Sequence, residues 1–447
     1  MEEFLASNSL FPTRLASGAG ILPSQEIYDF IATGKISCPL APISDDQVQP
    51  ASIDLRLSHE AYRVRASFLP GKSTTLIKKA TTNGMLEGKL DISDATCLEP
   101  GVVYIIPLME SLSLPPDVYG IANPKSTTGR LDIFTRLITE FGDEFERVRR
   151  GYSGGLYIEV VSQTWPILVK AGMKLNQLRF GRGRRGVIGE DRLKQLGQRD
   201  FLIDADEDRG QPNIDRGLRV TVDLEGNGSD IVAYQARKTH SPIDLSKIGH
   251  YEIDEFWNPI YRNEKRQYVL EPGEFYILAS KQRVRVPPNL AAEMLPYDLA
   301  TQEFRVHYAG FFDPGFGYGV KGEIPGTRAV LEVRASQMPI LLEDDQFVGR
   351  LNYYDMSETP AKVYGGSIGS SYQQQGLALS KQFKRECQNV SSAATGAPSV
   401  SLYHREAALA ANTDESQRGE AEADEDSILK IAFPDSGLRL RINAKNC

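Results

Sequence analysis

The stretch LEPGVVYIIPLMESLSLPPDVYGIANP, at residues 98–124, returns in related form as LEPGEFYILASKQRVRVPPNLAAEMLP at residues 270–296. Both segments open with a Pro-Gly turn, continue with an apolar run and reach a Pro-Pro turn in the same order, 172 residues apart. Self-similarity at a fixed spacing indicates a repeated structural unit. The stretch therefore predicts that the chain holds two copies of one domain.

The same register continues further along the chain. Residues 157–180, YIEVVSQTWPILVKAGMKLNQLRF, correspond to residues 330–353, VLEVRASQMPILLEDDQFVGRLNY. This alignment places Glu159 of the first copy at the position of Glu332 in the second. Two long matches in one order predict a tandem duplication.

Each copy alternates apolar and polar residues over short runs. Examples are VYII at 103–106 and FYIL at 275–278, and both are bounded by proline and glycine turns. Such runs are typical of a sandwich or barrel of short β-strands. The sequence therefore predicts a mainly β fold, built by tandem duplication, with a few short helices.

Two helices are expected. The first has Ser24 as its predicted N-cap, Gly34 as its stop and an apolar stripe formed by Ile27, Phe30 and Ile31. The second covers residues 190–196, inside a charged connector. The predicted domains are a first copy with the N-terminal helix at 1–180, the connector at 181–215, a second copy with a closing segment at 216–384 and an acidic tail at 385–447.

The tail is rich in alanine, serine and acidic residues and is expected to be disordered. Its last part, ILKIAFPDSGLRLRI, is expected to form a short strand or a docking peptide. Nothing else in the sequence explains an apolar segment at this place.

Charge and composition exclude several classes of protein. The 447 residues include 51 Lys and Arg against 59 Asp and Glu, a net charge of −8, so the chain is no polycation for nucleic acid. No apolar run approaches the roughly 18 residues of a membrane span. We expect a soluble, cytoplasmic protein without nucleic-acid or membrane partners. The four cysteines and five histidines lack the spacing of a zinc site or a disulfide framework.

A candidate anion-binding segment follows the Pro-Pro turn of the first copy. In NPKSTTGR, residues 123–130, Lys125 and Arg130 bracket Ser126, Thr127 and Thr128. Hydroxyl and backbone N–H groups can bind phosphate oxygens while Lys and Arg supply charge. A solvated turn is the alternative. The second copy has PYDLATQ at 296–302, without a base or a hydroxyl pair, so the copies have diverged in role.

The second copy offers different candidates. Asp313, in the FDPGFG turn at 312–317, could accept a hydrogen bond from a sugar hydroxyl, although an ordinary Asp-Pro-Gly turn has the same sequence. Glu159 and Glu332 each lie inside an apolar strand, where burial would raise the pKa and allow proton transfer near neutrality. An outward-facing strand residue is the alternative for both.

A glycine-rich closing segment ends the second copy. Residues 364–376, YGGSIGSSYQQQG, include Tyr372 and Gln375 and precede Lys381. Mobile glycines with polar donors suit a lid over phosphates. A plain flexible tail is the alternative.

These motifs, in this order, resemble dCTP deaminases of the dUTPase-like superfamily over about residues 20–384. The resemblance implies a duplicated dUTPase-like β-barrel or jelly-roll-type domain, trimeric in the family, with sites between neighbouring copies. It implies deamination of dCTP to dUTP and ammonia for pyrimidine deoxynucleotide synthesis, with a glutamate as proton shuttle, Mg²⁺ accompanying the triphosphate and no zinc. It also implies dCTP and dUTP as partners and a homo-oligomer, and it leaves open whether a feedback nucleotide binds.

The resemblance assigns roles to individual residues. The phosphate-binding and catalytic RSSLAR segment corresponds to Lys125, Ser126, Thr127 and Arg130, with Lys125 in place of the first Arg, and Thr127 and Thr128 in place of Ser and Leu. Asp313 corresponds to the deoxyribose-binding Asp, Glu332 or Glu159 to the catalytic Glu, and Tyr372 and Gln375 to the closing segment.

The divergence between the copies favours one composite site. In this hypothesis the first copy holds the phosphates, Asp313 and Glu332 meet the nucleoside, and Glu159 is a remnant. Three alternatives stay open, namely a dUTPase, a bifunctional dCTP deaminase and dUTP diphosphatase, and a non-catalytic nucleotide-binding barrel.

Overall fold

The computed structural model describes most of the two repeats and two short segments near the C-terminus. The described residues are 18–184, 186–200, 202–204, 212–226, 228–296, 304–307, 310–335, 338–365, 373, 375–385, 428–432 and 439–443. The chain divides into two compact units, Met1–Glu386 and Cys387–Cys447.

The first copy consists of two sheets. One has the order β1-β13-β8-β10 with β3 beside β13, where the strands are β1 (Gly20–Ile21), β3 (Ile53–Arg56), β8 (Val118–Pro124), β10 (Arg147–Val148) and β13 (Lys174–Arg182). The other has the order β5-β4-β7-β11-β9 with β2 beside β7, where the strands are β2 (Ile36–Ser37), β4 (Glu60–Val64), β5 (Leu86–Asp91), β7 (Val103–Ser113), β9 (Ile133–Thr139) and β11 (Ser153–Ser162).

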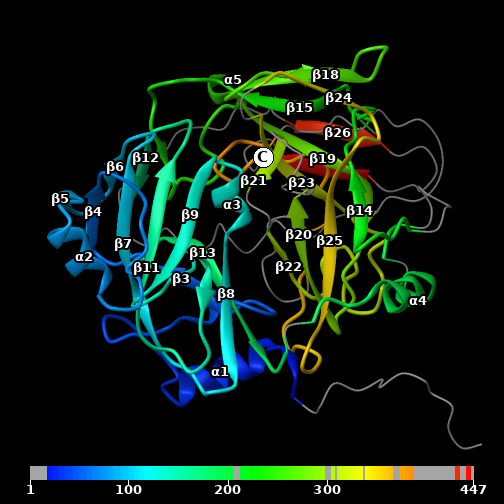
Figure 1. Cartoon of the computed structure of the whole chain (residues 1–447). Coiled ribbons are helices and arrows are strands. Elements are labelled where there is room, and N and C mark those ends of the chain that lie inside the picture. The colour runs from blue at the N-terminus through cyan, green and yellow to red at the C-terminus, as the bar shows by residue number, and fades with distance from the viewer. Residues whose placement is uncertain are drawn as a thin grey trace, which may run out of the picture. The chain divides into compact units, whose positions relative to one another are not determined.

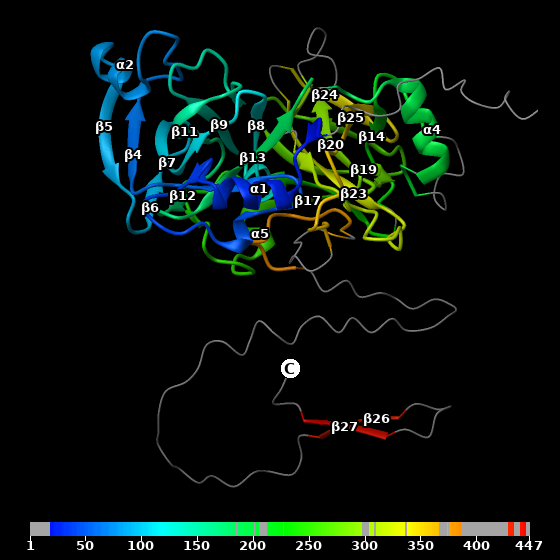
Figure 2. The same cartoon turned by 90° about the horizontal axis from the view of Figure 1, so that it is seen from below.

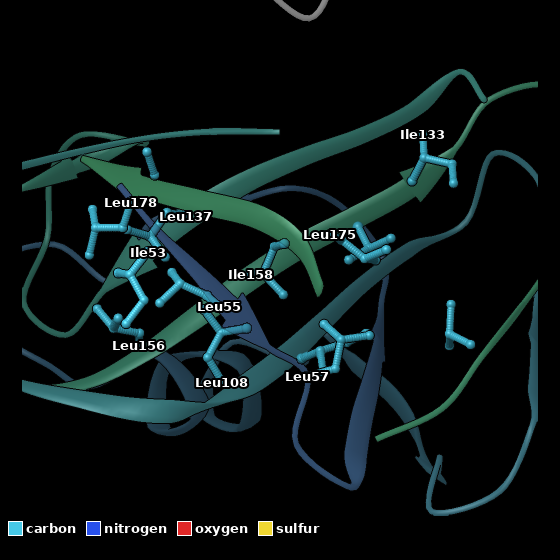
Figure 3. Packing of buried hydrophobic residues seen from close by; sticks show 14 of the residues in the cluster. Ile53, Leu55, Leu57, Leu108, Ile133, Leu137, Leu156, Ile158, Leu175 and Leu178 are labelled. Carbon is cyan, nitrogen blue, oxygen red and sulfur yellow. The ribbon is translucent and has the colours of Figure 1, made fainter. Parts of the chain in front are cut away.

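Aliphatic side chains of both sheets pack into one core. Figure 3 shows Leu55 from β3 and Leu178 from β13 close to Leu108, Leu137 and Ile158 from the opposite sheet. All five are buried, because alternate residues of each strand point toward the facing sheet. The alternating pattern in the sequence therefore corresponds to a sandwich with an interior of leucine and isoleucine.

The second copy repeats this topology. One sheet has the order β14-β25-β20-β22, from β14 (Leu218–Thr221), β20 (Leu290–Pro296), β22 (Phe311–Phe312) and β25 (Phe347–Asp355). The other has the order β17-β15-β19-β23-β21, from β15 (Ile231–Ala236), β17 (Trp257–Tyr261), β19 (Phe275–Val284), β21 (Phe304–His307) and β23 (Thr327–Ala335). The predicted mainly β fold with a tandem duplication is confirmed, and Figure 1 shows the two copies side by side.

Strand pairing joins the copies. In the first copy β6 (Thr96–Leu98) pairs with β12 (Ile167–Val169), and β16 (Ile243–Asp244) of the second copy adds to β12 as a parallel strand. In the second copy the corresponding pair is β18 (Gln267–Leu270) with β24 (Ile340–Glu343).

Aromatic packing reinforces this junction. The ring of Trp165 from the first copy lies 5.1 Å from that of Trp257 and 5.9 Å from that of Phe256, both from the second copy. All three side chains are fully buried, and aromatic pairs in this geometry add about 0.5–1.5 kcal/mol each beyond their area burial. The two copies thus share one apolar core at the junction.

The helices are short. They are α1 (Ser24–Ala32), α2 (Leu76–Thr82), α3 (Ser126–Gly129), α4 (Glu190–Asp200), α5 (Ile253–Phe256) and the 3₁₀ turn η1 (Asp45–Gln47). Among the described residues, none of these helices is long and apolar enough to cross a membrane. The predicted helix at 190–196 is present as α4 and extends four residues further.

The predicted cap of the first helix is wrong by one residue. Ser24 is the first residue of α1, and Pro23 occupies the N-cap position. The Ser24 hydroxyl accepts a hydrogen bond from the backbone N–H of Lys362 at 3.2 Å, so it joins the helix to the second copy. The apolar stripe is as expected, since Ile27 and Phe30 are buried and Ile31 packs against the same core.

The C-terminal unit contains one described pair of strands. β26 (Ile428–Ala432) and β27 (Arg439–Asn443) pair antiparallel, as Figure 2 shows. The segment that was expected to form a short strand or a docking peptide thus contains two paired strands. The remainder of the predicted acidic tail lies outside the described residues.

Candidate active site

A cavity of about 810 Å³ has walls from both copies. The first copy contributes residues around α3 and the loop before β13, and the second contributes the turn around Asp313, Glu332 of β23 and the segment around Gln375. The cavity thus brings together, within one chain, the site residues that the sequence placed in different copies. Tyr372 lies outside the described residues.

The predicted phosphate segment forms one wall. Lys125 follows β8, and its ammonium group pairs with the carboxylate of Asp54. Ser126, Thr127 and Thr128 line the cavity, but the buried Thr128 hydroxyl already donates a hydrogen bond to the carbonyl oxygen of Leu175 at 2.9 Å. This short turn therefore presents two hydroxyl groups and one ammonium group to a ligand.

Further lysines gather beside this segment. Lys174 and Lys381 also line the cavity, and Lys174 pairs with Asp46 at its rim. Burial and the like charges of Lys125 and Lys174 lower the pKa of Lys381. An anion would relieve this repulsion, so this end of the cavity, the lysine end, suits a polyphosphate.

Arg130 connects the phosphate segment to the closing segment and to the candidate base. Its Nη1 donates hydrogen bonds to Gln375 Oε1 at 2.9 Å and to the carbonyl oxygen of Ala378 at 3.1 Å. Its Nε lies 3.9 Å from Glu332 Oε1. The hydroxyl of Ser380 donates to the carbonyl oxygen of Thr127 at 2.9 Å, so residues 375–380 lie against the phosphate segment.

Glu332 lies on the cavity wall in the middle of β23. The pairing of β23 places it opposite Ile277 of β19 and His307 of β21. Burial raises the pKa of Glu332 to about 8, and the nearby charge of Arg130 opposes this rise. A carboxyl group with such a pKa can both accept and donate a proton near neutral pH.

Asp313 opens the predicted turn and is buried at the cavity wall. Its Oδ1 accepts a hydrogen bond from Arg179 Nη2 at 3.2 Å. Burial raises the pKa of Asp313, and the Arg179 charge opposes this rise. Gly315 has a φ of 95°, and a Cβ atom there would lie 2.3 Å from Val363 Cγ1, so the turn requires glycine.

Aromatic rings line the cavity beside this carboxylate. The rings of Phe312 and Phe316 are 5.0 Å apart, and those of Phe316 and Tyr364 are 5.5 Å apart. Flat apolar surfaces next to a hydrogen-bond acceptor suit a nucleoside. We call this part of the cavity the nucleoside end.

Glu159 is not among the residues that line the cavity. Its side chain is buried, and its Oε1 accepts hydrogen bonds from Arg136 Nη2 at 2.7 Å and Nε at 3.0 Å. The guanidinium group of Arg136 lies 3.6 Å from the ring centroid of Phe145 and also donates to Ser67. In the first copy, the carboxylate of Glu159 is thus enclosed by the Arg136 side chain, whose guanidinium group also contacts the Phe145 ring and Ser67.

Three residues of the site escaped the sequence analysis as candidates. Asp54, Lys174 and Arg179 each lie inside an ordinary strand, where single polar residues are common. The weak similarity of SIDL at 52–55 to TVDL at 221–224 is the one sequence signal that includes Asp54. Among the described residues no three His, Cys, Asp or Glu side chains form a metal-binding group.

Comparison with known proteins identifies the family. Models of the N-terminal and C-terminal domains of 2′-deoxycytidine 5′-triphosphate deaminase match residues 18–184 and 189–383. A dCTP deaminase from Natronomonas pharaonis is 31% identical over 127 residues, which are 28% of this chain and 60% of that protein. A dUMP-forming dCTP deaminase from Beutenbergia cavernae is 30% identical over 165 residues, 36% of this chain and 79% of that protein.

A solved structure extends the similarity to a larger share of the chain. The crystal structure of 2′-deoxycytidine 5′-triphosphate deaminase from Agrobacterium tumefaciens is 44% identical and has a TM-score of 0.71. The match covers 76% of this chain and 99% of that one. With both domain models matched in order, the chain belongs to the dCTP deaminase family.

Proposed function

We propose that the chain deaminates dCTP hydrolytically to dUTP and ammonia in the cavity between its two copies, with Glu332 as the proton shuttle. The observation that carries the proposal is the buried Glu332 carboxyl 3.9 Å from Arg130, in the lining of the cavity that also contains the lysine end and the nucleoside end. The names of the similar proteins support the choice of dCTP as substrate.

Binding at the two ends of the cavity would orient the substrate. Lys125, Lys174 and Lys381, with the hydroxyls of Ser126 and Thr127, would hold the triphosphate. Asp313 would accept a hydrogen bond from deoxyribose while the aromatic rings contact the nucleoside. Because the triphosphate is remote from the reacting carbon, its binding energy can serve to orient the base.

The chemistry requires one group that takes and returns a proton. The Glu332 carboxylate would accept a proton from water as the water oxygen bonds to C4 of cytosine, and would pass this proton to N3. Glu332 would then transfer the second proton of the former water to the amino group, so that ammonia leaves and the C4 carbonyl of uracil forms. Arg130, at 3.9 Å, would stabilise the carboxylate form of Glu332 during this exchange.

The lysine end contains one carboxylate that suits Mg²⁺. Asp54 Oδ1 is buried and has no hydrogen-bond partner among the described residues, and a hard carboxylate oxygen is the ligand that Mg²⁺ prefers. We propose that Asp54 holds the hydrated ion while the lysines bind the remaining phosphate charge. The ion would neutralise part of the triphosphate charge. The proposed reaction uses Glu332 as the base and assigns no role to zinc.

Ammonia release from dCTP by the purified chain tests the proposal. Ammonia formation with dUTP as the stoichiometric product supports it, and dCTP binding without ammonia release contradicts it. One observation favours a second candidate function, deamination of dCTP followed by hydrolysis to dUMP. Several similar proteins, among them a protein from Halobacterium salinarum, are named as dUMP-forming dCTP deaminases. Chromatography of products from dCTP and from dUTP, supplied separately, distinguishes the two, since only the second candidate forms dUMP.

A further inference from the structure

Arg179 is a buried cation at the centre of β13 in the first copy. Its side chain is 2% exposed, and burial lowers its pKa. Removing a guanidinium group from water is costly unless its charge and its donors are matched by partners. The partners of Arg179 therefore indicate which residues this buried side chain holds in place.

The hydrogen-bond partners of Arg179 lie in the second copy. Nη1 donates to the carbonyl oxygen of Ala292 on β20 at 3.1 Å, and Nη2 donates to the carbonyl oxygen of Phe312 at 3.4 Å. Nη2 also donates to Asp313 Oδ1 at 3.2 Å, and the guanidinium carbon lies 4.0 Å from the ring centroid of Phe311. One side chain thus fixes Asp313 and the two residues before it.

This arrangement leaves the other carboxylate oxygen of Asp313 for a ligand. Asp313 lines the cavity, and its hydrogen bond to Arg179 uses Oδ1 alone. A 2′-deoxynucleoside 5′-triphosphate has a single free sugar hydroxyl, on C3′. An ionised carboxylate that is fixed on one side would accept a hydrogen bond from this group at a defined position.

Comparison of the two copies shows that the contact between Arg179 and Asp313 has no equivalent elsewhere in the repeat. In the alignment of residues 157–180 with 330–353, the position of Arg179 is occupied by Asn352 in the second copy. The first copy has RGYSG at 150–154 where the second has the Asp-Pro-Gly turn. The arginine and the carboxylate that it contacts are therefore each present in one copy only.

We propose that Arg179 is a positioning residue that orients Asp313 for recognition of the 3′-hydroxyl of the substrate. Sugar recognition by the second copy then depends on a side chain of the first. The proposal rests on the proposed function for the identity of the nucleotide. The contacts of Arg179 with Asp313 do not depend on it.

The test compares two substrates on the full chain. Arg179→Met is assayed for ammonia release from dCTP and from 2′,3′-dideoxycytidine 5′-triphosphate, which lacks the 3′-hydroxyl. We expect kcat/KM for dCTP to fall by about 10- to 100-fold and kcat/KM for the dideoxy analogue to change by less than about 3-fold. Asp313→Asn should remove the same preference, and the double variant should lose no more than either single variant.

Two further variants distinguish the positioning role of Arg179 from a general loss of structure. Arg182→Met changes the same strand but removes ion pairs with Glu26 and Asp117, and should keep the preference for dCTP. Arg179→Lys retains a donor for Asp313 if Arg179→Met fails to fold, and should keep part of the preference because one ammonium group cannot bridge all three acceptors.

The outcomes separate the two proposals. An equal loss on both substrates by a folded Arg179 variant, or additive losses in the double variant, would overturn the positioning role. If the wild-type chain releases no ammonia from dCTP, the proposed function fails. Equilibrium binding of the two nucleotides to wild type and to Arg179→Met then tests the positioning role, which requires a selective loss of dCTP binding.

Discussion

Replacing Glu332 with glutamine separates proton transfer from binding. Glutamine preserves the shape of the side chain but cannot take a proton from water. A positioned general base contributes about 10²- to 10⁴-fold to the rate, so ammonia release from dCTP should fall by at least about 100-fold. The affinity for dCTP should change little, because the lysine end and Asp313 are left intact.

The pH dependence of the rate provides a second readout. Because burial raises the pKa of Glu332 to about 8, most of the free enzyme holds this group protonated at pH 7. If the carboxylate form accepts the proton from water, kcat/KM of the wild type should rise with pH and level off above about pH 8. Glu332→Gln should lack this rise.

Stability should change in the opposite direction to activity. The ordinary pKa of a glutamate is 4.5, and that of Glu332 in the fold is about 8. Below pH 4.5 both states hold the proton, whereas between these values only the folded state keeps it, so folding becomes less favourable as pH rises. Each pH unit in this window costs the wild type about 1.4 kcal/mol relative to Glu332→Gln. Urea unfolding of both proteins at pH 6 and pH 7 measures this difference.

Glu159→Gln is the matched control. Glu159 is also buried and occupies the corresponding strand position, but its carboxylate already accepts two hydrogen bonds from Arg136. This variant should lose stability, because it leaves Arg136 without its charge partner, and should keep most of its turnover. The reasoning is refuted if turnover collapses in Glu159→Gln and survives in Glu332→Gln.

Three other variants or treatments test separate parts of the site. Lys381→Met should weaken binding of dCTP by about 10-fold or more and of dCMP much less, since the ammonium group lies at the lysine end; equal losses measured by calorimetry would contradict the assignment. Activity should require Mg²⁺ and should survive removal of transition metals, and a stoichiometric zinc found by metal analysis and lost together with activity would refute the mechanism. Ending the chain after Lys384 should leave cooperative thermal unfolding nearly intact, because Met1–Glu386 is a compact unit of its own and keeps the buried Phe383; a large fall in Tm would refute this.

The sequence predicted the fold because the repeat and the strand alternation are properties of many residues at once. In β7, Tyr104 and Ile105 are both buried, and burial then alternates from Ile106 to Leu112, as expected for a strand with one face toward a core. The proline and glycine turns determine where strands end. The cap of α1 was predicted wrongly because Ser24 and Pro23 both suit a helix start. In the structure the Ser24 hydroxyl accepts a hydrogen bond from the backbone of Lys362, far along the chain, and does not cap the helix.

The candidate site could be predicted only where polar residues cluster in sequence. Lys125, Arg130 and Asp313 lie in short motifs with unusual composition, and the structure places all three at one cavity. Arg179 and Lys174 are single charged residues in a regular strand, with no local signal that distinguishes them from surface residues. Their partners belong to the other copy or to a distant loop, so only the folded chain reveals them.

The choice between the two glutamates shows why local sequence is insufficient. Glu159 and Glu332 occupy equivalent positions in similar apolar strands, and both are buried. What differs is the residue paired with each on the neighbouring strand, since β9 places Arg136 beside Glu159 whereas β21 places His307 opposite Glu332. A carboxylate held by Arg136 at 2.7 Å is a structural anion, and one that faces a cavity with its cation at 3.9 Å remains available to a substrate. The difference between the copies at this one paired position therefore supports the proposal of a single composite site that contains Glu332 and not Glu159.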